Sequence, residues 1–91
     1  MFVVPDTEYT IDASAKTITL SSTYANVVAG QITRIVDITT GEVIFDANQP
    51  RSRQTEITVS AGVITYQFAI NVKNTDVLRI ELESTYPATV L

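Results

Sequence analysis

The sequence predicts an all-β fold. Threonine, valine and isoleucine make up 35 of the 91 residues, and branching at Cβ suits these side chains to a pleated sheet. No long segment carries apolar residues at the 3.6-residue period of a capped helix. Turn signals recur about every ten residues, which is typical of two-sheet proteins. We therefore expect an immunoglobulin-like antiparallel β-sandwich of about seven strands, with a small β-barrel as the alternative.

The strands are expected where β-favouring residues run between turn signals. Seven main strands are predicted at 8–12, 16–21, 31–39, 42–47, 55–60, 63–71 and 77–83, and residues 2–4 are expected to add a short edge strand. Gly41 and Gly62 follow the third and fifth of these strands, and glycine readily adopts the positive φ of a tight hairpin turn. Residues 73–76 are rich in turn-forming types.

Apolar alternation assigns the faces of the strands. Leu78, Ile80 and Leu82 alternate with charged residues, so the last strand is expected to be half-buried. Strand 31–39 does not alternate cleanly, because Ile35 falls on the face opposite to its other apolar residues. The same rule places further side chains in the core: Ile18, Leu20, Val43, Phe45, Ile64, Tyr66, Phe68 and Ile70.

Composition limits the chemistry of the chain. We expect one domain over residues 1–91, with apolar arms at 1–5 and 84–91. There is no histidine and no cysteine, which excludes Ser-His-Asp and Cys-His catalysis and thiolate metal sites. The net charge of -4 disfavours nucleic-acid binding. No apolar run reaches the length of a membrane span or has the form of a signal peptide.

Carboxylates are the remaining candidates for catalysis and metal binding. Asp37 and Asp46 lie on strands expected to pair, as a glycosidase pair would require, but they are expected to face solvent near a hairpin. Asp12 and Asp76 join them as potential calcium ligands. Turn chemistry accounts for Asp12 and Asp76 without a metal. We expect no enzyme activity, no cofactor and no metal.

Aromatic side chains raise the possibility of carbohydrate binding. The sequence has no tryptophan, so the stacking platforms would be tyrosines. Tyr66 is expected in the core, while Tyr24 and Tyr86 are expected near the surface. Tyr9 is the fourth tyrosine.

Partner contacts are expected at one loop and at both arms. Arg51 and Arg53 stand two residues apart, so in an extended segment both guanidinium groups lie on one face and suit a carboxylate. A solvated loop is the alternative. The apolar arms would either cover a sheet edge or dock on a partner by adding a strand. Their predicted contact residues, together with Tyr24, are Phe2, Val3, Val4, Tyr86, Pro87 and Leu91.

Three segments carry a resemblance to a known class of proteins. They are "TIDASAKTITLSSTYANVVAGQITRIVDITTGEVIFD", "GVITYQF" and "NTDVLRIEL", which together span residues 10–83. They resemble small β-sandwich virion proteins of tailed bacteriophages, of the decoration, head-fibre or auxiliary capsid kind. The pattern is built from β-hairpins and includes no catalytic motif.

The resemblance implies a structural role in a phage particle. The protein would decorate or reinforce a capsid, in many copies, through contacts with capsid or other virion proteins. It would be a homo-oligomer located in the virion, with no nucleic-acid or membrane partner. The alternatives are a phage tail or fibre component and a carbohydrate-binding or adhesive β-sandwich module.

Overall fold

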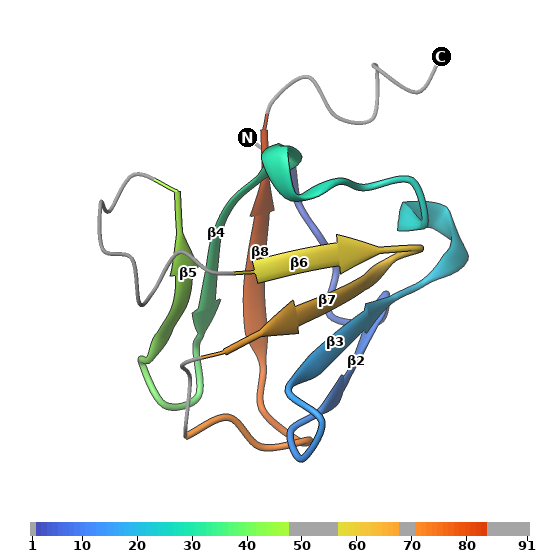
Figure 1. Ribbon diagram of the computed structural model, residues 1–91. Helices are drawn as coiled ribbons and strands as arrows, with labels where there is room; N and C mark the ends of the chain where they lie inside the picture. The colour runs from blue at the N-terminus through green and yellow to red at the C-terminus, as the bar shows by residue number, and fades with distance from the viewer. Residues whose placement is uncertain (1, 48–56, 68–70, 84–91) are drawn as a thin grey trace.

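The computed structural model describes residues 2–47, 57–67 and 71–83 of the chain. Eight strands in the described residues form two four-stranded antiparallel sheets, packed face to face (Figure 1). Sheet A has the order β1 (Phe2–Val3), β8 (Leu78–Leu82), β4 (Ile32–Asp37) and β5 (Val43–Asp46). Sheet B has the order β2 (Tyr9–Asp12), β3 (Thr17–Leu20), β7 (Val63–Tyr66) and β6 (Ile57–Ser60). The predicted sandwich is confirmed.

The strand order follows an immunoglobulin-like plan except at one edge. Sheet B matches the order A-B-E-D of that plan, and β8, β4 and β5 match F, C and C′. The place beside F normally belongs to the following strand, G. Here it is taken by β1, from the other end of the described chain. The edge strand predicted near residues 2–4 therefore lies beside β8 in sheet A.

The hairpin turns form where the sequence places them. Gly41 and Gly62 have φ of 80° and 81°, in the left-handed region that favours glycine. Ala61 precedes Gly62 with φ of 51° and completes the tight turn between β6 and β7. Two short 3₁₀ helices, η1 (Ser22–Tyr24) and η2 (Ala29–Gln31), lie in the connection from β3 to β4.

The core lies between the two sheets and draws on both. Its most deeply buried side chains in β3, β7 and β8 lie at alternating positions, and β4 adds Ile32 and Ile35. Tyr9, Ile11, Ile57 and Val59 of the sheet B edge strands pack against it and stay half-buried. The buried apolar residues are Val4, Ile18, Leu20, Tyr24, Val27, Ile32, Ile35, Ile44, Phe45, Ile64, Tyr66, Val72, Leu78, Ile80 and Leu82.

Irregular pairing corrects the expected faces in β4 and β5. Val43 and Phe45 were predicted to be the inward pair of their strand, but Ile44 and Phe45 are both buried and Val43 is half-buried. The register shifts between Ile35 and Val36, so residue 44 is an extra residue opposite β4. A second shift on the β8 side of β4 accompanies a change of faces along that strand, where Ile32 and Ile35 are both buried.

Several strands are shorter than predicted. The strand expected at 63–71 ends at Tyr66, and Phe68 and Ile70 lie outside the described residues. The arm at 84–91 also lies outside them. Within the described ranges, no helix has the length and apolar character needed to cross a membrane.

Candidate functional site: the outer sheet faces and a carboxyl pair

The outer face of sheet B carries hydroxyl groups across all four strands. Thr10 on β2 lies opposite Thr19 on β3, and Thr17 lies opposite Thr65 on β7, which in turn lies opposite Thr58 on β6. These side chains point away from the core because their neighbours at alternate positions point into it. We call this surface the threonine face; its members are Thr10, Thr17, Thr19, Thr58, Ser60, Val63 and Thr65.

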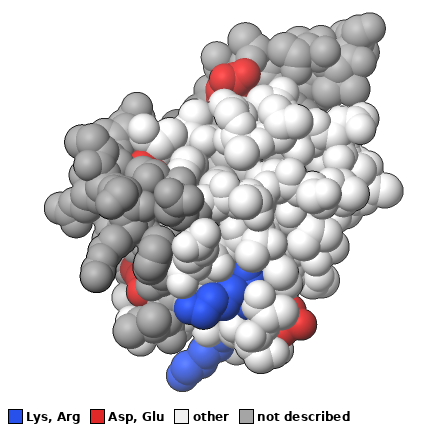
Figure 2. Space-filling model, in the orientation of Figure 1, with Lys and Arg blue, Asp and Glu red and all other residues white. Residues whose placement is uncertain are grey.

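The centre of the threonine face carries no charged side chain. Sheet B lies toward the viewer in Figures 1 and 2, and the centre of that surface is free of lysine, arginine, aspartate and glutamate (Figure 2). Asp12, the last residue of β2, lies at a corner of this face opposite Thr17, and it accepts hydrogen bonds from the Ser14 hydroxyl at 2.8 Å and the Ala15 N–H at 3.2 Å. These bonds, led by that from Ser14, lower the pKa of Asp12. The Lys16 ammonium donates to the Gln67 carbonyl at 3.0 Å.

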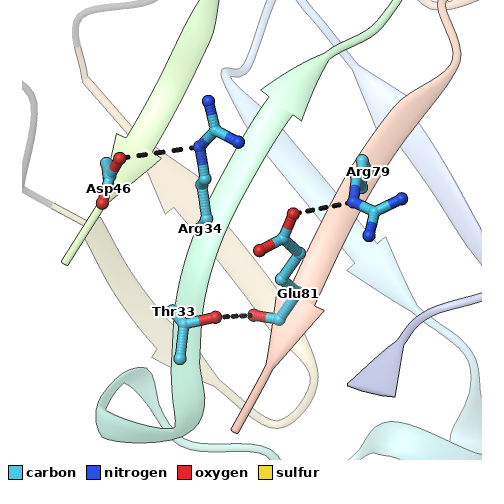
Figure 3. A network of polar contacts seen from close by, with 5 residues as sticks. All are labelled: Thr33, Arg34, Asp46, Arg79 and Glu81. Atoms are coloured by element: carbon cyan, nitrogen blue, oxygen red, sulfur yellow. Dashed lines mark hydrogen bonds and ion pairs between the residues drawn. The ribbon is translucent and has the colours of Figure 1, made fainter. Parts of the chain in front are cut away.

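The outer face of sheet A is charged by contrast. Arg34 on β4 forms an ion pair with Asp46 on β5 at 3.5 Å, and Arg79 pairs with Glu81 along β8 at 2.7 Å (Figure 3). The Thr33 hydroxyl donates to the Glu81 carbonyl at 3.1 Å and so joins β4 to β8. Exposed pairs of this kind contribute little to stability. On this face each arginine is paired with a carboxylate, as is common on surfaces that contact water.

Two carboxyl groups meet where the turn after β4 approaches the turn before β8. Asp37 is fully buried, and its Oδ1 accepts the Thr40 N–H at 3.1 Å. Asp76 is 8% exposed, and its Oδ2 accepts the Lys73 N–H at 3.0 Å. The two carboxyl groups lie within hydrogen-bonding reach of each other. A hydrogen bond between two carboxyl groups forms only when one of them is protonated, because an ionised carboxylate has no donor.

The pKa values of the two carboxyl groups are shifted in opposite directions. Burial, and then the hydrogen bond to Asp76, raise the pKa of Asp37. The same bond, accepted by Asp76, is the main cause of the lowered pKa of Asp76, with the Lys73 N–H second. The Oδ2 of Asp37 is buried and has no hydrogen-bond partner among the described residues. Asp37 is therefore the more readily protonated of the two groups, and their contact joins the two turns.

The structure corrects the expectation for Asp37. It was predicted to face solvent and to be able to approach Asp46, but it is buried and contacts Asp76 instead. Asp46 lies opposite Arg34, nearer the other end of β4. Asp12 and Asp76 serve their own turns, as predicted. Among the described residues, no group of three or more His, Cys, Asp or Glu is placed to hold a metal ion.

A shallow hollow of about 280 Å³ lies beside the edge of β2. Tyr9 forms part of its wall, and the Tyr9 hydroxyl accepts the Leu78 N–H at 2.8 Å and faces the Leu78 carbonyl at 3.3 Å. Burial is the main cause of the raised pKa of Tyr9. Its ring is therefore fixed between the sheets rather than presented as a stacking platform. The lining residues are Asp6, Tyr9, Thr10, Ile11, Asn74, Asp76 and Val77.

The other tyrosines in the described part of the chain are core residues. Tyr66 is 2% exposed, as predicted, but Tyr24 is 5% exposed and not at the surface as expected. The reason is local, since η1 turns the chain inward with a bond from the Tyr24 N–H to the Ser21 carbonyl at 2.9 Å. Tyr86 lies outside the described residues. None of the three described tyrosines offers an exposed ring to a sugar.

The remaining predicted contact residues divide between one strand and the undescribed segments. Val3 lies in β1 and is 37% exposed, while Val4 is 1% exposed and fills the core beside β8. Phe2 belongs to the same strand. Five lie outside the described residues: Arg51, Arg53, Tyr86, Pro87 and Leu91. Comparison of the chain with protein-family models, with curated proteins and with solved structures finds no match.

Proposed function

We propose that this protein is a structural component of a tailed-phage virion that decorates or reinforces the capsid through protein–protein contacts. The threonine face is the observation that carries the proposal. It spans all four strands of sheet B with a charge-free centre and one charged residue, Asp12, at a corner, in a chain whose net charge is -4. The resemblance of residues 10–83 to small phage virion proteins supplies the setting.

The chemistry of the threonine face suits a protein interface. Charged residues are depleted at the centres of interfaces, because a charge loses more hydration than it regains. Threonine offers a methyl group for packing and a hydroxyl that is both donor and acceptor. Its branched Cβ also restricts χ1, so little side-chain freedom is lost on docking. The charged outer face of sheet A lacks these properties.

The mechanism is passive. A rigid sandwich docks on a site that exists only in the assembled shell. Any protein that binds the assembled state and not the free subunits stabilises the assembly by linkage. Repetition of the site over the shell then multiplies a modest contact. This role uses no reaction centre.

A single lysine on the threonine face tests the proposal. Thr65 is exposed at the centre of the face, between Thr17 and Thr58. The Thr65→Lys protein should keep the wild-type circular dichroism and urea midpoint. Its binding to undecorated capsids, measured by co-sedimentation and light scattering, should weaken at least about tenfold, because an unpaired charge is buried.

The matched control is the same substitution in a loop. Thr7 is exposed outside the threonine face, so the Thr7→Lys protein should bind shells like the wild type. Equal binding by the two variants would contradict the role of the threonine face. Failure of the wild-type protein to bind any shell would contradict the virion function itself.

The arginine loop gives a second test of the same function. Arg51→Ala with Arg53→Ala should leave folding unchanged and weaken shell binding, if the two guanidinium groups meet a carboxylate on a neighbour. Replacing both by lysine keeps the charge but removes the bidentate geometry. A partial loss with lysine and a larger loss with alanine is the expected order. Unimpaired incorporation of the alanine protein would exclude a docking role for the loop.

A further inference from the structure

The outer edge of β8 holds a strand that is far from it in sequence. Phe2 pairs with Leu82 and Val3 with Glu81, and the Val4 N–H donates to the Ile80 carbonyl at 3.0 Å. In the immunoglobulin plan, the strand at this place follows F through a short connection. The place is filled here by a separate segment. We call residues 2–4 the N-terminal arm.

The N-terminal arm is short and is followed by a proline. β1 has two residues, and the buried Val4 side chain anchors the end of the arm in the core. Because Pro5 follows, Val4 is restricted to extended backbone conformations. Val4 therefore favours the backbone shape of a strand residue whether the arm is docked or free. A turn closed by the Glu8 N–H and the Pro5 carbonyl at 3.0 Å then leads to sheet B.

The available edge of β8 matches the arm in length. Beyond Ile80, the next outward peptide group belongs to Leu78, and the Tyr9 hydroxyl already occupies it. Within the described residues, the edge open to a strand therefore begins beyond Leu78 and includes Ile80 and Leu82. We call this edge the slot. The arm pairs along this slot, with Phe2 opposite Leu82 and the Val4 N–H bonded to the Ile80 carbonyl.

We propose that the N-terminal arm is exchangeable and that the slot also takes the arm of a second copy of this chain. The incoming arm is chemically identical, so it makes every bond that the resident arm made. Exchange of identical elements is for this reason a low-cost route to association. The Pro5 turn is the hinge. The proposal goes beyond the virion function and does not depend on it, because it concerns only two copies of this chain.

Cysteine cross-linking tests the exchange on the full chain, which has no native cysteine. The Val4–Ile80 bond makes Val3 and Glu81 a non-hydrogen-bonded pair, with Cα atoms about 4.5 Å apart, which suits a disulfide. Val3→Cys and Glu81→Cys are made as separate proteins, mixed and oxidised. The expected product is a disulfide heterodimer whose peptide map joins positions 3 and 81. Its yield should rise with protein concentration.

Two controls decide the result. Val3→Cys mixed with Asn26→Cys, an exposed loop position, gives the background of random disulfides, and the expected yield lies several-fold above it. A yield at background overturns the proposal. The double variant Val3→Cys/Glu81→Cys should give some interchain dimer along with the intrachain bond. Closure entirely within one chain at every concentration, or no bond between positions 3 and 81 at all, also overturns it.

Discussion

The carboxyl group of Asp37 lies against that of Asp76, and this contact joins the turn after β4 to the turn before β8. Asp37 is fully buried, and its Oδ1 is held by the Thr40 N–H. The same two turns are also linked by the Ile38 N–H, which donates to the Val77 carbonyl at 2.8 Å. The pair thus belongs to the connection between the two central strands of sheet A.

Protonation of the pair predicts an optimum in the pH dependence of stability. Folding raises the pKa of Asp37, so stability falls as the pH rises through that raised pKa. Folding lowers the pKa of Asp76, so stability also falls as the pH drops through that lowered pKa. The free energy of unfolding, measured with urea across pH, should be greatest between the two. Tyr9 and Tyr66 nearby have raised pKa values and stay neutral in this range.

Replacement of Asp37 tests whether its raised pKa causes the fall in stability at higher pH. In Asp37→Asn the amide keeps a donor toward Asp76 and cannot ionise, so the fall in stability above the raised pKa should disappear. Asp46→Asn makes the same chemical change on the charged outer face and should keep the fall. Asp37→Ala removes the acceptor of the Thr40 N–H as well and should cost about 1–3 kcal/mol. An unchanged pH profile in Asp37→Asn would show that another group causes the fall in stability.

Removal of one hydroxyl should expose part of the edge of β8. In Tyr9→Phe, the Leu78 N–H loses its partner at 2.8 Å, which should cost about 1–2 kcal/mol in the free energy of unfolding. Hydrogen exchange of the Leu78 amide should become faster. The Val4 amide, bonded to Ile80, is the internal reference and should be unaffected until the protein unfolds globally. Equal acceleration of both amides would mean that the whole edge opens together.

The two hairpin glycines should differ in their tolerance of alanine. Both have φ near +80°, so either substitution strains the backbone by about 1–2 kcal/mol. A Cβ at Gly41 meets nothing within 4 Å, whereas a Cβ at Gly62 lies 3.3 Å from the Cα of Ala25. Gly62→Ala should therefore be the more destabilising in urea unfolding, by up to a further 1–3 kcal/mol of overpacking. Equal losses would show that the Ala25 loop moves aside freely.

Local patterns were enough to predict the sandwich and several of its hairpins. The strands β3, β7 and β8 each have one buried face. The alternation of Ile18 and Leu20, or of Ile64 and Tyr66, therefore predicts directly which side chains lie in the core. The turn at Gly62 follows from backbone sterics alone. These features depend on residues that are close in sequence.

Features set by distant neighbours could not be predicted in the same way. The burial of Ile44 beside Phe45 depends on a register shift between β4 and β5, which alternation cannot reveal. Asp37 reads as a turn residue, and only the folded chain brings Asp76 to it. Tyr24 lies in a connection without periodicity, and η1 turns it inward. The threonine face was visible as alternating polar positions, but the lack of charge at its centre appears only once all four strands are aligned.

The placement of β1 beside β8 also has a kinetic consequence. Pairing these strands, and bonding Tyr9 to Leu78 across a separation of 69 residues, closes nearly the longest loop that the described chain allows. The entropy of that closure is lost before the contacts compensate for it, and such topologies fold slowly. The hairpins β2–β3 and β6–β7 need only short loops and can form early. We therefore expect closure of the edge of sheet A to be the slow step of folding. Because Tyr9 takes part in that closure, its replacement should slow folding more than replacement of Gly41.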